Sequence, residues 1–165
     1  MRILLLLTVV LLSACGFHLR GQVGMPFATL YLKAENPNTP FITDLRKNLA
    51  ANRVRLVSTA EQAEVVLYIV TEVADKQILS LGGDGRVNEF RLAYRVSLRA
   101  YDLKQQDWIP AEEMEIRRDY SFDDTKTLAK EAEEALLNRS MRSDMVQQIV
   151  RRLSRAKPQP LTHPK

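Results

Sequence analysis

The stretch RLAYRVSLRAYDL, from Arg91 to Leu103, carries the clearest structural signal in this chain of 165 residues. Apolar and polar residues alternate along it, and a period of two is typical of a β-strand with one buried face. The apolar positions are Leu92, Tyr94, Val96, Leu98 and Ala100, whereas Arg91, Arg95 and Arg99 fall on the opposite face. The pattern predicts a strand that buries one face in a core and carries three arginines on the other.

Two neighbouring stretches also read as strands. Val65 to Leu79 is rich in β-branched residues, apolar on both faces at first and alternating later. The sequence GGDG, residues 82–85, follows it and signals a tight turn. Trp108 to Phe122 is expected to return antiparallel, and Pro110 makes it an edge strand or starts it with a bulge.

Helical spacing occurs in two segments. Ile42, Leu45 and Leu49 predict a helix from about Pro40 to Asn52, capped by Asn38 or Thr39. A long helical pattern then runs from Thr125 to about Arg155, with acids at its start and basic residues at its end, which suits the helix dipole. Its apolar positions are Leu128, Ala132, Ala135, Leu136, Met141, Met145, Val146, Ile149 and Leu153, and their phase drifts at residues 138–140, which allows a bend.

The order of elements predicts an α/β fold. Thr29 to Lys33 alternates as a short strand, and Val54 to Val57 is a further extended candidate. The first helix can connect Thr29 to Lys33 and Val65 to Leu79 as parallel neighbours. The economical architecture is a two-layer sandwich, a mixed sheet of about four strands with two helices packed on one face. The other face, with its arginines, is left for a partner or for water.

The amino terminus predicts export. Arg2 precedes an apolar run from Ile3 to Leu12, and small residues follow at 13 and 14, which are the three parts of a secretory signal peptide. The run has about half the length that a membrane-spanning helix needs. The sequence LSAC, residues 12–15, resembles the lipobox of bacterial lipoproteins, in which the signal is cut before the cysteine and the cysteine carries the lipid. Gly16 after it, rather than an aspartate, favours the outer membrane by the same resemblance.

Cys15 is the only cysteine, so no disulfide can form within one chain. A metal site is disfavoured because the only histidines, His18 and His163, are near opposite ends of the chain. A catalytic thiol would have to rely on His18, three residues away in an expected flexible end rather than in a preorganised cleft. Covalent attachment of lipid, which anchors firmly through several acyl chains, is the best reading of Cys15.

These signals divide the chain into four parts. Residues 1–14 are the cleaved signal peptide, residues 15–26 the lipidated N-terminus and tether, residues 27–156 a single α/β domain, and residues 157–165 a proline-containing flexible tail. Cleavage leaves 165 − 14 = 151 residues, and loss of Arg2 lowers the net charge from +4 to +3. That length suits one domain with one core.

No catalytic constellation is apparent. Between Leu19 and Thr162 there is neither histidine nor cysteine, and no phosphate-binding loop motif occurs. Glu112, Glu113 and Glu115 could supply a carboxylate pair, but a solvated edge explains them better. No enzyme, no metal and no cofactor other than the lipid on Cys15 is therefore expected. Recurrent basic residues remain, and because an exported lipoprotein rarely meets nucleic acid, phosphorylated lipopolysaccharide is the polyanion that suits them.

The chain resembles the LptE family of lipopolysaccharide-assembly lipoproteins. The resemblance rests on CGFHLR, residues 15–20, on the EFRLAYRVSLRAYD strand, residues 89–102, and on the closing helix, TLAKEAEEALLNRSMRSDMVQQIVRRL, residues 127–153. It implies a two-layer α/β sandwich that sits as a plug in the lumen of the LptD β-barrel, helps that barrel to assemble and binds lipopolysaccharide. It also implies an outer-membrane, lipid-anchored protein that faces the periplasm.

The resemblance also names candidate binding residues. Leu128-Ala129-Lys130 matches the start of the family's last helix, which implies a lipopolysaccharide contact at Lys130. Arg86 is the only basic residue in the hairpin loop, where the family has another contact, and Arg91 follows in the next strand. Two other readings stay open: an adaptor lipoprotein of another envelope machine that binds only protein, and a periplasmic enzyme.

Overall fold

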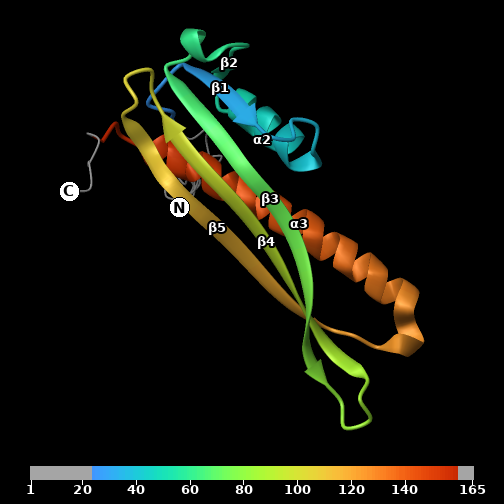
Figure 1. Cartoon of the computed structure of the whole chain (residues 1–165). Helices are drawn as coiled ribbons and strands as arrows, with labels where there is room; N and C mark the ends of the chain where they lie inside the picture. Colours follow the sequence, from blue (N-terminus) through green and yellow to red (C-terminus); the bar gives the residue numbers. More distant parts are fainter. Residues whose placement is uncertain (1–23, 160–165) are drawn as a thin grey trace, which may run out of the picture.

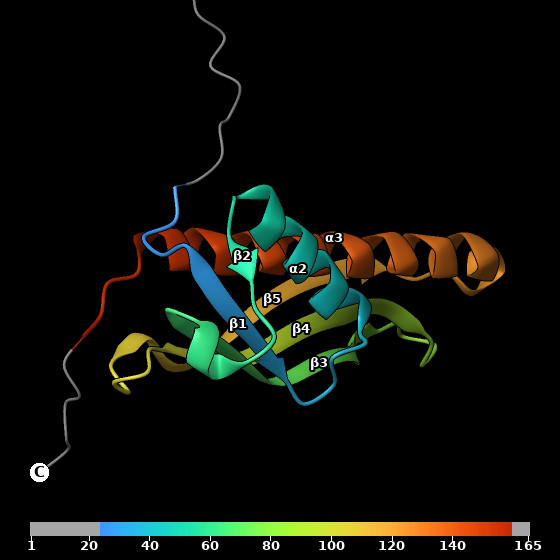
Figure 2. The same ribbon diagram turned by 90° about the horizontal axis from the view of Figure 1, so that it is seen from above.

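The computed structural model describes residues 24–159, and these form a five-stranded sheet covered on one face by two helices (Figures 1 and 2). The strand order is β2-β1-β3-β4-β5. The strands are β1 (Thr29–Ala34), β2 (Arg55–Leu56), β3 (Val65–Leu81), β4 (Val87–Tyr101) and β5 (Asp107–Ser121). The helices are α2 (Pro40–Ala51) and α3 (Thr127–Arg155), with the 3-10 turns η1 (Ala60–Gln62) and η2 (Asp124–Lys126). The expected two-layer α/β sandwich is confirmed, and its sheet has five strands where the sequence predicted about four.

The additional strand is β2, which contributes only two residues. It pairs in parallel with β1, Thr29 opposite Arg55 and Leu30 opposite Leu56. The sequence already showed an extended candidate from Val54 to Val57, but a two-residue strand has no period of its own. Pairing with β1 is what makes it part of the sheet.

Strand β4 is the stretch with the clearest alternation, and it lies between β3 and β5 with both pairings antiparallel. Its apolar positions face the helices and are at most 4% exposed: Leu92, Tyr94, Val96, Leu98 and Ala100. The other side of the strand, here called the open face, carries Arg91, Arg95 and Arg99. Each of these arginines pairs with a carboxylate of the neighbouring strand β5. The predicted division of the two faces is correct.

The sheet narrows toward the β3–β4 hairpin. Strand β1 pairs with β3 only as far as Ile69, and β5 ends opposite Glu89, so the tip of the hairpin is two-stranded. Gly85 in the connecting turn has φ = +77°, a conformation that favours glycine. Pro110 lies in β5, which is an edge strand, and the pairing with β4 shifts register there, between Leu98 and Ala100. The two features predicted for Pro110, an edge strand or a bulge, therefore occur together.

Helix α2 begins where the sequence predicted. Thr39 is the N-cap, and its Oγ1 accepts a hydrogen bond from the Ile42 amide at 3.2 Å. The same hydroxyl donates to Glu72 Oε2 at 2.6 Å, and the Tyr94 hydroxyl donates to Glu72 Oε1 at 2.5 Å. Burial and this hydrogen bond raise the pKa of the Tyr94 phenol. One carboxylate thus ties α2 to β3 and β4.

Helix α3 is continuous across residues 138–140, where the drift in phase allowed a bend. Its second half fills the core with Met141, Met145, Val146, Ile149 and Leu153. The apolar positions of its first half are different, because Leu128 is 83% exposed and Leu136 is 59% exposed. The first half projects toward the hairpin tip rather than into the core (Figure 1).

Several expectations fall outside residues 24–159. The signal peptide, the lipidation site Cys15 and the tail from Pro160 onward are not among the described residues. The start of the predicted tail is described, and the Gln159 amide donates to the Asp107 carbonyl at 2.8 Å. Within the described residues, no helix is long and apolar enough to cross a membrane.

Candidate functional site

The hairpin turn and the start of α3 lie at one end of the molecule, here called the distal end (Figure 1). The chain enters at Gly24 and α3 finishes at Arg155 at the opposite, proximal end (Figure 2). Arg86, Arg91 and Lys130, the three cations expected to contact lipopolysaccharide, all lie toward the distal end. Their partners decide what the site can do.

Arg86 connects the hairpin turn to the start of α3. Its Nη1 lies 3.0 Å from Asp124 Oδ2 in η2, and its Nε lies 3.4 Å from Asp84 Oδ2 in the turn. Its side chain remains 67% exposed. Arg86 also lines a pocket of about 540 Å³ between the turn and residues 122–124. The guanidinium is therefore held in place but open to a ligand.

Lys130 lies in the first turn of α3. Its Nζ is 2.8 Å from Glu133 Oε2 and 3.2 Å from Ser121 Oγ, at the end of β5. Only 16% of its side chain is exposed, so its methylene stem is packed and its ammonium points toward the β5 end. Lys130 is thus more enclosed than a freely solvated helix lysine.

Arg91 is on the open face and makes a two-pronged pair with Asp119 of β5. Nε and Nη2 donate to the two carboxylate oxygens at 2.8 Å each. This hydrogen bonding holds the pKa of Asp119 below its usual range and raises that of Arg91. Arg91 thus binds both oxygens of one carboxylate, while 38% of its side chain remains exposed.

The structure brings the three cations together along one segment. Arg91, Lys130 and Arg86 contact Asp119, Ser121 and Asp124 respectively, all within six consecutive residues that end β5 and begin η2. The sequence predicts the cations and an acid at Asp124 at the start of the last helix, but it does not predict that Asp119, Asp124 and Glu133 pair with the cations. Strand register and the placement of α3 determine these partners, and neither is visible in a linear pattern.

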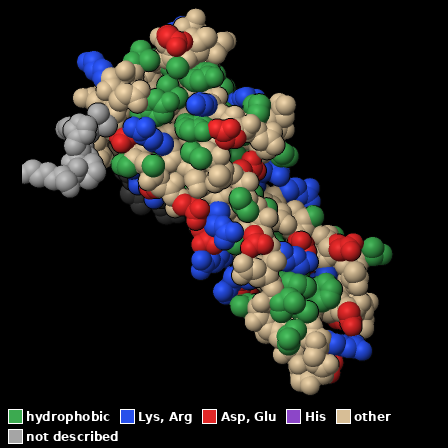
Figure 3. All heavy atoms as spheres, in the orientation of Figure 1, with side chains coloured by type: hydrophobic (Ala, Val, Ile, Leu, Met, Phe, Trp, Pro, Cys, Tyr) green, Lys and Arg blue, Asp and Glu red, His purple; other side chains and the backbone are tan. Residues whose placement is uncertain are grey.

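Exposed apolar side chains accompany the charges at the distal end. Four are at least 58% exposed: Ile78, Leu81, Leu128 and Leu136. On the face seen in Figure 3, hydrophobic side chains form one group near the hairpin end and further groups toward the opposite end, while acidic and basic side chains are interleaved over the middle of the sheet. The only sequence signal for these residues was the helical spacing of Leu128 and Leu136, which indicated a core. Their exposure makes the distal end amphipathic.

An aromatic cluster supports this end from inside. Phe90 stacks on Tyr120 with ring centroids 5.8 Å apart and contacts Phe122 edge-on at 5.2 Å. Lys76 Nζ lies 4.1 Å from the Phe90 ring centre and 2.6 Å from Glu134 of α3. The Tyr120 hydroxyl also donates to Glu134, at 2.7 Å, so that Lys76 and Tyr120 together connect the first half of α3 to strands β3 and β5.

The carboxylates considered for catalysis are all committed elsewhere. Glu112 accepts from Arg152 of α3, Glu113 from Ser97, and Glu115 from Arg117. The hydrogen bond from Arg117 lowers the pKa of Glu115, whereas a general acid needs a raised one. Among the described residues, no group of three or more potential ligands could hold a metal ion.

Comparison with known proteins identifies the family. A family model described as LptE, lipopolysaccharide-assembly, matches residues 27–153. The chain is 28% identical over 150 residues to the LPS-assembly lipoprotein LptE of Pectobacterium atrosepticum, covering 89% of this chain and 80% of that protein. It is 29% identical over 155 residues to the LptE of Photorhabdus laumondii, covering 92% and 83%.

Solved structures give the same picture of the fold. The solution NMR structure of an uncharacterized lipoprotein B from Nitrosomonas europaea matches with a TM-score of 0.73 at 38% identity, over 84% of this chain and 90% of that one. The crystal structure of the rare lipoprotein B from Shewanella oneidensis matches with a TM-score of 0.69 at 28% identity, over 77% and 94%.

Proposed function

Because the chain belongs to the LptE lipopolysaccharide-assembly family, we propose that it is a non-enzymatic outer-membrane lipoprotein that serves the LptD β-barrel. It is anchored through lipid on Cys15, faces the periplasm and occupies the lumen of that barrel. There it assists assembly of the barrel and binds lipopolysaccharide on the way to the outer leaflet.

The amphipathic distal end is the observation that carries this proposal. Lipopolysaccharide combines phosphorylated sugars with acyl chains, so a site for it needs cations beside apolar surface. Arg86 and Lys130 supply the cations, and exposed Leu128, Ile78 and Leu81 supply apolar surface at the same end. Guanidinium and ammonium groups form charge-assisted hydrogen bonds with phosphate oxygens.

The carboxylate partners do not prevent such binding. Exposed ion pairs stabilise a folded protein by only about 0–1 kcal/mol. A phosphate that approaches Arg86 can therefore replace Asp124 at small cost, because both side chains of that pair are more than half exposed. The pair with Asp124 keeps the Arg86 guanidinium oriented until a ligand displaces the carboxylate.

The open face of the sheet suits the lumen of a barrel. The interior of a membrane β-barrel is polar, unlike its lipid-facing exterior. Arg95 and Arg99 pair across the open face with Glu115 and Asp107, at 3.8 and 2.6 Å. At 1.5 Å per residue, the 29 residues of α3 extend about 44 Å, more than the hydrocarbon core of about 30 Å. An elongated body with a polar face fits this environment.

Lipopolysaccharide binding tests the site. The full chain should bind lipopolysaccharide with an affinity that falls in the Lys130→Ala and Arg86→Ala variants and with added salt. Lys47→Ala in α2 removes one exposed charge outside the distal end and is the matched control, with no expected change. Equal affinity in all four proteins would refute the site.

Co-purification from membranes tests the partner. The acylated chain should co-purify with the LptD barrel at a molar ratio near one. Co-purification with a barrel but no binding of lipopolysaccharide would favour the protein-only adaptor. Turnover of an envelope substrate that is lost in a variant of Glu112, Glu113 or Glu115 would favour the enzyme.

A further inference from the structure

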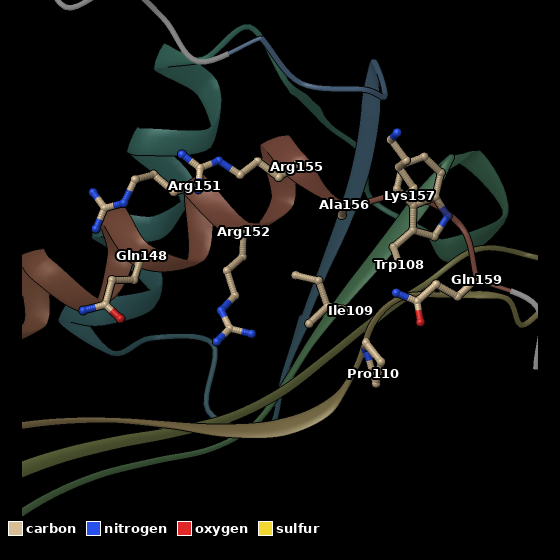
Figure 4. A pocket seen from close by; sticks show the side chains of 10 residues that line it. All are labelled: Trp108, Ile109, Pro110, Gln148, Arg151, Arg152, Arg155, Ala156, Lys157 and Gln159. Carbon is tan, nitrogen blue, oxygen red and sulfur yellow. The ribbon is translucent and has the colours of Figure 1, made fainter. Parts of the chain in front are cut away.

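A second basic site lies at the proximal end, outside the region that the proposed function uses. A pocket of about 560 Å³ opens between the last turns of α3, the start of β5 and the segment that follows α3. Arg151, Arg152, Arg155 and Lys157 contribute four positive charges to its lining, with Trp108 and Gln148 beside them (Figure 4). None of its ten lining residues is acidic.

Most of this charge has no acidic partner. Figure 4 shows Arg152 reaching from α3 toward β5, where its Nη1 contacts Glu112 at 2.5 Å. Arg151 reaches only the Gln147 amide oxygen, at 3.5 Å. Among the described residues, no ion pair forms with Arg155 or Lys157. The pocket therefore retains about three uncompensated positive charges, in contrast to the paired cations of the distal end.

Helix electrostatics account for only a small part of this charge. The C-terminus of a helix carries the equivalent of about half a negative charge, which basic residues in the last turn offset. One lysine or arginine is enough for that purpose. The other unpaired cations are therefore available to bind an anion.

The position of the pocket relates it to the lipid anchor. The Trp108 ring packs edge-on against Phe27, with centroids 5.6 Å apart, and Phe27 is three residues from Gly24, where the described chain begins. Gly24 lies nine positions after Cys15. Nine fully extended steps of the chain span at most about 30 Å. Lipid on Cys15 would thus hold the proximal end close to the membrane surface.

We propose that this pocket binds the phosphate of an anionic phospholipid headgroup in the leaflet that holds the anchor. Arginine presents planar donors that match phosphate oxygens, and Arg151 and Arg155 are one helical turn apart on α3. Tryptophan is enriched at the interface between membrane and water, where Trp108 would lie. The inference requires lipid on Cys15 but does not depend on lipopolysaccharide binding at the distal end.

Trp108 provides a direct assay because it is the only tryptophan in the chain. The acylated full chain is reconstituted into phosphatidylcholine vesicles with an increasing share of phosphatidylglycerol, and the Trp108 emission maximum is recorded. The anchor is the same throughout, so that any change reports the headgroup. We expect a shift to shorter wavelength that saturates with phosphatidylglycerol and is reversed by salt.

Three sets of variants locate the effect. Arg151→Gln/Arg155→Gln/Lys157→Gln should abolish the shift, since each basic residue near an anionic surface contributes about fivefold and three together about a hundredfold. Arg46→Gln/Lys47→Gln/Arg139→Gln removes the same charge from exposed positions outside the pocket and should keep the shift. Arg151→Lys/Arg155→Lys retains the charge and should keep part of it. Circular dichroism confirms that each variant is folded.

Three results would overturn the proposal. The natural chain could show no difference between the two lipid compositions, or the two triple variants could behave alike. Glycerol 3-phosphate added to pure phosphatidylcholine vesicles could also produce the full shift, which would assign the pocket to a soluble phosphate. The Arg86→Gln/Lys130→Gln variant separates the two sites, because it should lose lipopolysaccharide binding and keep the phosphatidylglycerol response.

Discussion

Replacing Leu128 by glutamine separates a ligand-binding surface from a folding core at the start of α3. The side chain is 83% exposed, and full burial of a leucine contributes about 1.5–3 kcal/mol. The buried sixth is therefore worth less than about 0.5 kcal/mol to folding. If an acyl chain covers the exposed part, binding loses about 1.2–2.5 kcal/mol, which is about 8- to 70-fold in affinity. Glutamine has nearly the helix propensity of leucine, so α3 should persist.

The assay measures lipopolysaccharide affinity and thermal unfolding on the same preparations. Leu128→Gln should lower the affinity and leave the unfolding temperature almost unchanged. Leu153→Ala is the opposite control, because Leu153 is fully buried and its truncation should cost about 2–5 kcal/mol of stability. A Leu128→Gln chain that binds lipopolysaccharide as the natural chain does, or that unfolds as early as Leu153→Ala, would refute a ligand-binding role for Leu128.

Three further outcomes are expected. Asp124→Asn removes the nearer of the two carboxylate partners of Arg86 and should raise lipopolysaccharide affinity by up to about fivefold in a binding titration; a decrease would mean that Asp124 itself binds the ligand. Thr39→Ala removes the α2 cap and the contact with Glu72, and should lower the unfolding free energy in urea by about 1–2 kcal/mol. Burial favours protonation of Glu134, but hydrogen bonds from Lys76 and Tyr120 outweigh it and lower its pKa. The stabilisation from these hydrogen bonds is fully present above the pKa of glutamate in the unfolded chain, about 4.3, and is lost as the pH falls through the lower pKa of Glu134 in the folded chain. Glu134→Gln should therefore flatten the decline of the unfolding temperature with falling pH.

The alternation of β4 shows how far the sequence alone reaches. It predicts which residues enter the core and places Arg91, Arg95 and Arg99 on the open face, because the side-chain period of a strand is fixed by backbone geometry. It does not give the partners of those arginines. Asp119 faces Arg91 only because of the register of β5, which the bulge at Pro110 shifts.

Helix α3 shows where periodicity is ambiguous. Leu128 and Leu136 have the same spacing as the core residues that follow, yet the sheet no longer lies beneath them in the way it lies beneath Met145 and Leu153. An apolar face predicts burial without naming the surface that buries it. The basic pocket at the proximal end could not be predicted from the sequence either, since Trp108 and Arg155 are 47 positions apart and only the fold brings them together.

Photo-crosslinking at Leu128 in living cells tests lipopolysaccharide binding at the distal end most directly. A photoreactive amino acid is placed at Leu128 of the full acylated chain and, as a control, at exposed Lys47 in α2. Irradiation should yield an adduct with lipopolysaccharide at position 128 and none at position 47. No adduct at position 128, or equal yields at both positions, would contradict a lipopolysaccharide site at this end of the molecule.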